Sequence, residues 1–251
     1  MQLSSQDGIS LFTRAGYGRL LEIALASGYR FLAFDDPAHD TEPRVCLLRH
    51  DVDADPGAAL ELARIEADLG VHSTFFMMLR SPLYNILGRE NSRLVSEIVS
   101  LGHRLGLHYD IAFLPGEHSG TDEWVQFERG VLAKSFDTDV SVVSYHQPRS
   151  SARPLLPGFN GMVLADSVQG YTFLADSNRA QRMSRLPEIL RDASEPHLQL
   201  LVHPIWWATD QPDATTEQLW NEAFMRNIER SHEQLFTCEG AFGARRRFTI
   251  D

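Results

Sequence analysis

The stretch Val45-Cys46-Leu47-Leu48-Arg49-His50-Asp51-Val52-Asp53 decides how the rest of this chain is interpreted. Its mostly apolar first half predicts a buried strand. Helix signals follow directly, since Asp55 is a suitable N-cap and Pro56 suits the first helical position. The two aspartates of the stretch therefore fall at the carboxyl end of a strand, where α/β folds bind ligands. The plainer alternative is that both aspartates cap the helix or lie in a surface turn.

Strand-like and helix-like segments alternate along the chain. Besides the central strand, strands are expected over 29–34, 71–78, 104–107, 140–145, 162–165, 171–175 and 198–202, and helices over 11–26, 56–69, 92–101, 124–134 and from about Thr215 onward. This alternation predicts a parallel sheet with helices outside it. We therefore expect one domain over residues 1–251, an α/β fold with a single (β/α) barrel of seven or eight mostly parallel strands, distorted or incompletely closed. An open doubly wound sheet would give a similar pattern, but no glycine-rich phosphate loop favours its nucleotide-binding form.

The composition argues against several kinds of partner and site. The formal net charge of -11 disfavours a nucleic-acid partner, because phosphates would be repelled. The two cysteines, Cys46 and Cys238, are too few for a disulfide framework or a thiolate metal site. No apolar run approaches the roughly 20 residues that span a bilayer, and the polar start does not resemble a signal peptide. We therefore expect a cytoplasmic protein without a membrane span.

Polar side chains follow several predicted strands at the point where each strand ends. Taken singly, each has a plain explanation as a rim histidine or a turn cap. Taken together, histidines and aspartates at one rim are what metal-assisted hydrolysis requires, because they hold a divalent ion and leave a position for water. The residues concerned are Asp51, Asp53, His108, Asp110, His146, Asp176 and His203.

Three of these strand ends resemble the motifs of the polysaccharide deacetylase family, also called carbohydrate esterase family four. His50-Asp51-Val52-Asp53 resembles its first motif, Gly102-His103-Arg104-Leu105-Gly106-Leu107-His108 its second, and Leu200-Leu201-Val202-His203-Pro204 its last. The motifs stand in the family's order. The resemblance implies a (β/α) barrel with seven or eight strands, in agreement with the pattern of segments.

The resemblance also implies roles for individual residues. Asp51 matches the catalytic base, and Asp53 and His108 match ligands of a divalent metal, for which zinc is expected. His203 matches the general acid, and Asp176 resembles the aspartate that orients it. These assignments predict a catalytic group of one base, one acid and one orienting carboxylate beside a metal ion.

The sequence departs from the family's pattern at two places that concern the metal. Ala112 stands where the second motif has a further histidine, and His146 stands where the third motif has an arginine. The third ligand is therefore open. His146 is the first candidate, because it too follows a core strand, and Asp110, His118 or an extra water are the others. A weakened or lost metal site is the remaining alternative.

Four residues are expected to contact substrate: His146, Tyr109, Trp206 and Trp207. The two tryptophans suit the face of a sugar ring, although packing at the rim explains them equally well.

The family resemblance predicts a metal-dependent hydrolase that removes an acetyl group from an N-acetylated sugar, oligosaccharide or sugar nucleotide. A role in bacterial surface-polysaccharide biosynthesis of the O-antigen type is expected with it. One alternative is a non-catalytic sugar-binding or scaffold protein with an eroded metal site. Another is a hydrolase of a different linear amide, such as a deformylase.

Overall fold

The computed structural model describes residues 10–111, 122–148, 157–179 and 181–238. The described strands form one sheet, in which β6, β5, β4, β3, β2, β8 and β7 are neighbours in that order, and β1 pairs with β2. Every pairing between these strands is parallel. The strands are β1 Arg30–Phe31, β2 Val45–Val52, β3 Thr74–Met77, β4 Arg104–Tyr109, β5 Val142–Tyr145, β6 Val163–Leu164, β7 Thr172–Ala175 and β8 His197–Val202.

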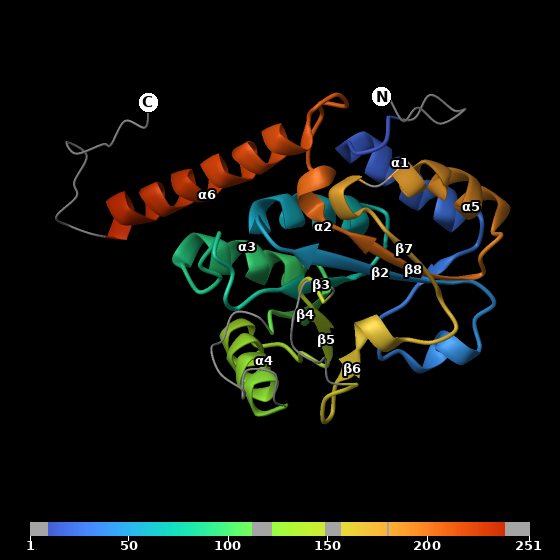
Figure 1. Ribbon diagram of the computed structural model, residues 1–251, viewed down its shortest axis with the longest axis horizontal. Coiled ribbons are helices and arrows are strands. Elements are labelled where there is room, and N and C mark those ends of the chain that lie inside the picture. Colours follow the sequence, from blue (N-terminus) through green and yellow to red (C-terminus); the bar gives the residue numbers. More distant parts are fainter. Residues whose placement is uncertain (1–9, 112–121, 149–156, 180, 239–251) are drawn as a thin grey trace.

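Seven strands curl through 220° into an open half-barrel with helices around it (Figure 1). This confirms the predicted barrel, in its incompletely closed form. Among the described residues β6 and β7 are the two ends of the sheet and do not pair with each other.

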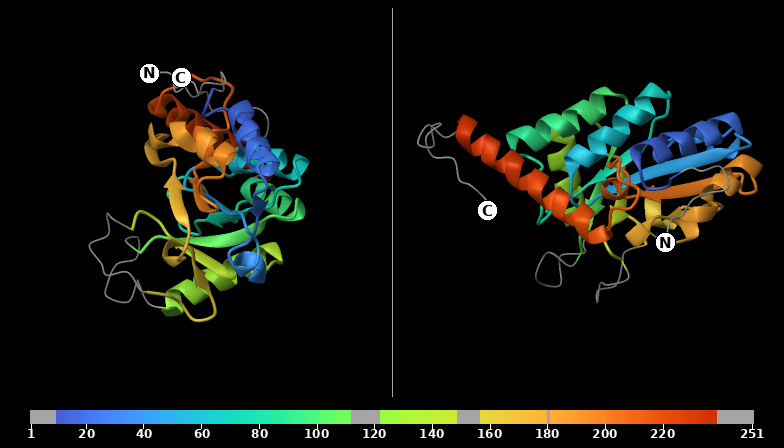
Figure 2. Two further views of the ribbon diagram at one scale, coloured as in Figure 1. Left: turned by 90° about the vertical axis from the view of Figure 1, so that its right-hand side faces the viewer. Right: turned by 90° about the horizontal axis from the view of Figure 1, so that it is seen from above.

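The helices cover the outside of the half-barrel (Figures 1 and 2). One of them, α5, was not expected, because its seven residues are too few to show a helical period in the sequence. The longest helix, α6, extends past the barrel at one side (Figure 2). The helices are α1 Arg14–Ala26, α2 Pro56–Asp68, α3 Arg89–Ser100, α4 Asp122–Phe136, α5 Leu186–Asp192 and α6 Thr216–Cys238.

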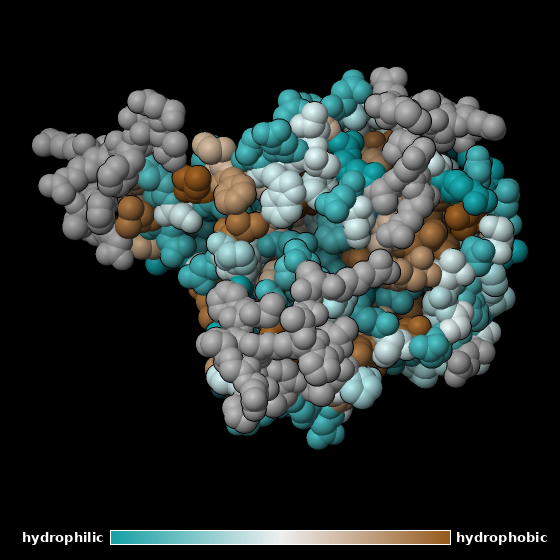
Figure 3. All heavy atoms as spheres, viewed as in Figure 1, coloured by the Kyte–Doolittle hydropathy of each residue, from teal (hydrophilic) through white to brown (hydrophobic). Residues whose placement is uncertain are grey.

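Helix α6 carries apolar side chains on its surface. Phe224 and Ile228 are 47% and 40% exposed, and brown apolar atoms lie along this helix in Figure 3. Among the described residues, no helix has the length and apolar character needed to cross a membrane.

Strand β2 lies at the centre of the sheet and carries the decisive stretch. It pairs with β8 on one side and with β3 on the other, and all of its residues are buried. Because side chains alternate along a strand, Arg49 and Asp51 face the inside of the half-barrel and His50 faces the helices. The contacts agree, since Arg49 binds Asp51 and His50 lies against Tyr17 of α1 and Glu66 of α2.

A buried polar cluster stands behind β2, between the sheet and helices α1 and α2. The carboxylate of Glu66 accepts hydrogen bonds from Tyr17 Oη (2.6 Å) and Ser73 Oγ (2.5 Å), and it lies 2.6 Å from His50 Nε2. Burial alone would raise the pKa of Glu66, but His50, His103 and Ser73 together outweigh burial and lower this pKa. These contacts join helices α1 and α2 to β2 and to Ser73, the residue that precedes β3.

The turn after β2 forms as predicted. Asp55 is the N-cap of α2, where its side chain accepts the backbone N–H of Gly57 at 2.9 Å, and Pro56 opens the helix. The cap is thus Asp55, which leaves Asp51 and Asp53 free of the capping role that was the plainer explanation for them.

Candidate metal and catalytic site

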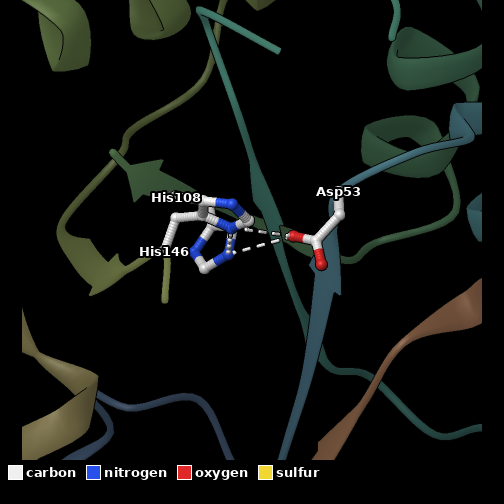
Figure 4. A group of neighbouring side chains, drawn as sticks. All are labelled: Asp53, His108 and His146. Carbon is white, nitrogen blue, oxygen red and sulfur yellow. Dashed lines mark hydrogen bonds and ion pairs between the residues drawn. The ribbon is translucent and has the colours of Figure 1, made fainter. Parts of the chain in front are cut away.

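Asp53, His108 and His146 come together at the carboxyl ends of three neighbouring strands. Asp53 follows β2, His108 lies near the end of β4, and His146 follows β5 directly. Asp53 points across the half-barrel toward the two imidazoles (Figure 4). Asp53 Oδ1 lies 3.2 Å from His108 Nε2 and 3.3 Å from His146 Nδ1, and these two nitrogens are 3.3 Å apart.

These three distances fit a tetrahedral metal ion. A zinc ion with bonds of about 2.0–2.1 Å holds its ligand atoms about 3.3 Å apart, which is the spacing found here. Asp53 Oδ1 is also buried and, apart from its close approach to these two imidazoles, has no hydrogen-bond partner among the described residues. Three donor atoms that converge in this way, one of them a carboxylate oxygen without a partner, fit one divalent cation.

Both histidines are oriented by further contacts. His108 Nδ1 lies 2.8 Å from Ser144 Oγ, so a proton on Nδ1 leaves Nε2 free to bind a metal. The backbone N–H of His146 donates to the carbonyl oxygen of Tyr109 at 2.9 Å. The ends of β4 and β5 therefore fix the two rings relative to each other.

His203 and Asp176 form a pair beside this cluster. His203 Nδ1 is 2.5 Å from Asp176 Oδ1, and the backbone N–H of His203 donates to Asp176 Oδ2 at 2.9 Å. The indole N–H of Trp207 donates to the same oxygen at 2.6 Å. These bonds turn His203 Nε2 toward the cluster, where it lies 3.8 Å from Asp53 Oδ2.

Asp51 is held from its own strand by Arg49. Arg49 Nε donates to Asp51 Oδ1 at 3.1 Å and Arg49 Nη2 donates to Asp51 Oδ2 at 2.8 Å. Arg49 Nη1 donates to Asp166 Oδ1 at 3.1 Å, and Asp166 in turn accepts the backbone N–H of Tyr145 at 2.8 Å. The buried guanidinium, 1% exposed, therefore anchors Asp51 between β2 and β5.

The charges of the site favour ionised carboxylates and a protonated His203. Burial opposes ionisation of Asp51 and Asp53, but Arg49 lowers the pKa of Asp51, and His108 and His146 lower the pKa of Asp53. Burial also opposes a charged His203, but Asp176, together with Asp53 and Asp51, outweighs it and raises the pKa of His203 to about 9. The site thus pairs an ionised carboxylate, suited to accept a proton, with a histidine suited to donate one.

Three of the four residues expected to contact substrate are buried in the packing of the protein. Tyr109 is 1% exposed, because it follows His108 on β4 and side chains alternate, so it points into the packing outside the half-barrel. Trp207 is fully buried against Phe12, with ring centroids 4.6 Å apart, and Trp206 is 3% exposed and packs against Trp220. Neither indole presents a face to a sugar. His146 is the one predicted contact that remains at the site.

The residues considered for the third metal ligand divide as follows. His146 joins Asp53 and His108, whereas Asp110 is not part of the group whose ligand atoms converge. His118, like Ala112, lies outside the described residues. The geometry therefore favours His146 as the third ligand.

Sequence reasoning missed the orienting role of four residues: Arg49, Ser144, Asp166 and Trp207. The sequence does contain a signal for Arg49, because an arginine inside an apolar strand needs a buried partner of opposite charge. Asp51 lies two residues later and therefore on the same face of the strand. Ser144 stands two residues before His146, but nothing local links it to His108. Asp166 and Trp207 meet their partners only through the fold.

Comparison with known proteins gives matches among solved structures alone. No family model matches the chain, and no curated protein does. The structures matched include BA3943, a CE4 family pseudoenzyme from Bacillus anthracis, at 17% identity and a TM-score of 0.43, with 75% of this chain and 64% of that chain covered. They also include the peptidoglycan deacetylase PdaC from Bacillus subtilis, at 13% identity and a TM-score of 0.46, with 79% and 98% covered.

A further match is IcaB from Ammonifex degensii, at 15% identity and a TM-score of 0.42, with 84% of this chain and 89% of that chain covered. The matches are to proteins of the family that the motifs resemble. The chain spans about two thirds of the length of BA3943, at 64%.

Proposed function

We propose that this chain is a metal-dependent hydrolase that removes the acetyl group from an N-acetylated sugar. The observation that carries the proposal is the triangle of Asp53 Oδ1, His108 Nε2 and His146 Nδ1, with sides of 3.2–3.3 Å, next to the His203–Asp176 pair. The motifs that resemble the polysaccharide deacetylase family support the same class of reaction.

The residues of the site divide the reaction between them. Asp53, His108 and His146 would hold a divalent ion, for which zinc suits the ligand set and spacing. Such an ion supplies Lewis acidity toward the amide carbonyl and lowers the pKa of water. Asp51, kept ionised by Arg49, accepts a proton from the attacking water.

His203 completes the reaction as the general acid. Asp176 fixes its ring through Nδ1, and Nε2 faces the cluster. With its pKa raised to about 9, His203 carries a proton at neutral pH and gives it to the departing amine nitrogen. The products are acetate and the free amino sugar. We assign the substrate to bacterial surface polysaccharides or their precursors on the family resemblance.

Metal analysis of purified protein tests the site. Wild-type protein should hold one zinc ion per chain, and the double variant Asp53→Ala/His108→Ala should hold none. His146→Ala should lose most of the metal as well. His72→Ala, at an exposed histidine outside the site, is the matched control and should keep one ion. A folded double variant with unchanged metal content would contradict the assignment.

Acetate release tests the reaction, with N-acetylglucosamine oligosaccharides and UDP-N-acetylglucosamine as probes. His203→Ala should lower turnover by about 10²–10⁴-fold with the metal retained. Protein that binds no metal would favour the sugar-binding or scaffold alternative. Protein that binds zinc but releases acetate from neither probe would favour hydrolysis of another amide, which formate release from N-formylated compounds would then test.

A further inference from the structure

Helix α6 contacts the turn that directly follows the metal ligand Asp53. Asn227 Nδ2 donates to the carbonyl oxygen of Ala54 at 2.7 Å. Arg226 Nε donates to Asp55 Oδ2 at 2.5 Å, and Arg230 Nη2 donates to Asp55 Oδ1. The last described helix of the chain is therefore bonded to the two residues that follow Asp53.

These contacts reach a carboxylate that is shielded from water. Asp55 is 0% exposed, while Arg226 and Arg230 are partly exposed. Arg230 Nη2 also donates to Asn227 Oδ1 at 2.6 Å, so that the three side chains of α6 act as one group. Because a buried carboxylate needs charged or hydrogen-bonding partners, Asp55 fixes the position of α6 and α6 fixes the position of Asp55.

The rest of the turn is held from a second side. Tyr84 Oη donates to the carbonyl oxygen of Val52 at 2.7 Å, and Ser81 Oγ donates to that of Asp53 at 3.1 Å. Both residues lie in the segment between β3 and α3. Together with Asn227 at Ala54, three successive backbone carbonyls are each bound by a side chain from a distant part of the chain.

We propose that Arg226, Asn227 and Arg230 of α6 are positioning residues that hold the β2–α2 turn so that Asp53 keeps its place in the metal triangle. The proposal rests on the function proposed above. A metal ligand must be held within a fraction of an ångström, and side chains that support ligands commonly change metal affinity by about 10–100-fold. Asp53 is the first residue after β2, so the position of its carboxylate depends on how the turn is held.

Gly57 offers a way to separate this positioning from general stability. A Cβ at Gly57 would lie 2.8 Å from Arg230 Nη1 and 3.1 Å from Asp55 Oδ1. Gly57→Ala should therefore push Arg230 away from Asp55, although alanine is the better helix former and by itself favours α2. If Gly57→Ala acted only through the stability of α2, it would not weaken metal binding. Weaker metal binding in this variant would therefore indicate a change in the position of the turn.

The test uses the full chain with Asn227→Leu and Gly57→Ala, each compared with wild type. Zinc affinity is measured by competition with a chromophoric chelator, and amide hydrogen exchange of residues 53–55 and 57 is measured in metal-free protein. Both variants should bind zinc about 10–100-fold more weakly, and their turn amides should exchange faster. The matched control is Gly130→Ala on α4, where a Cβ meets nothing within 4 Å, and which should change neither measurement.

Zinc affinity within twofold of wild type in both variants, with unchanged exchange, would overturn the proposal. If wild-type protein binds no zinc, the proposed function fails. The hydrogen-exchange measurement by itself then tests the positioning role of the α6 residues. Equal exchange rates in wild type and both variants overturn that role. If Asn227→Leu does not fold, Gly57→Ala gives the result.

Discussion

Replacing Asp176 with asparagine removes a carboxylate beside His203 and should lower the pKa of His203 by about 1–2. The pKa of His203 is raised to about 9 in the folded protein, against about 6.5 for a free histidine, a difference worth about 3 kcal/mol. Burial works against this rise, and Asp176, 2.5 Å from Nδ1, is its largest source. Asp53 and Asp51 contribute the remainder, so part of the rise should survive in the variant.

The same pair sets how stability depends on pH. Because folding raises the pKa of His203, its contribution to the free energy of unfolding is complete below about pH 6.5 and is lost as the pH rises to about 9. In metal-free protein, the advantage of wild type over Asp176→Asn should therefore shrink between these two values. Urea unfolding across this range measures it.

The direct assay is an NMR titration of the imidazole signals in metal-free protein. The chain has ten histidines, so His203→Gln is needed to assign the signal of His203. A wild-type His203 that titrates near pH 6.5, or an identical titration in Asp176→Asn, would refute the reasoning. Trp207 also donates to Asp176, and the amide oxygen of the introduced asparagine can still accept one of these bonds, so the variant tests the charge with little loss of packing.

Three further perturbations test other parts of the structure. Arg49→Lys removes the two-bond contact with Asp51, so turnover should fall by about 10²-fold while metal content stays at one ion; equal turnover would show that Asp51 needs no such anchor. Glu66→Gln replaces a buried carboxylate that binds three partners and should lower the free energy of unfolding in urea by about 1–3 kcal/mol, with metal content unchanged. Gly106→Ala would place a Cβ 2.5 Å from a ring carbon of Phe76. The overpacking should lower the free energy of unfolding in urea by about 1–3 kcal/mol. A variant as stable as wild type would show that the Phe76 ring or the sheet shifts without cost.

Much of the fold is predictable because each element is built from local signals. The apolar run of β2 and the Asp55–Pro56 helix start are both contiguous in sequence, and both are found in the structure. Strand β1 is shorter than expected, since it pairs only with the first two residues of β2. The length of β1 depends on its pairing with β2 and cannot be predicted from the sequence of β1 itself.

The site was predictable in part for a related reason. Asp53, His108 and His146 each lie at the end of a recognisable strand, and parallel strands bring their carboxyl ends to one rim. Which of two successive side chains faces inward depends on the register of the pleat, and that is why Tyr109 was misplaced beside His108. The burial of Trp207 depends on α1, whose Tyr17 packs against it at 5.6 Å between ring centroids.

One departure from the pattern of the resembled family, His146, can be understood through charge. His146, which stands where the family has an arginine, puts a neutral donor beside Asp53 in place of a fixed cation that would repel a metal ion. The fixed cation of this site is Arg49, which lies on the other side of Asp51 and binds Asp166 as well. The carboxylates of Asp51, Asp53, Asp166 and Asp176 then face the two cations Arg49 and protonated His203.

Two negative charges remain among these contacting groups, and one divalent ion neutralises them. Without an ion, protons are the alternative, and Asp53 indeed raises the pKa of His146 against the effect of burial. Protons and metal thus compete for the same imidazole, so metal affinity must fall as the pH falls. Relative to the resembled family, the two strands therefore exchange roles. The end of β5 offers His146 as a metal ligand, and β2 supplies the cation Arg49.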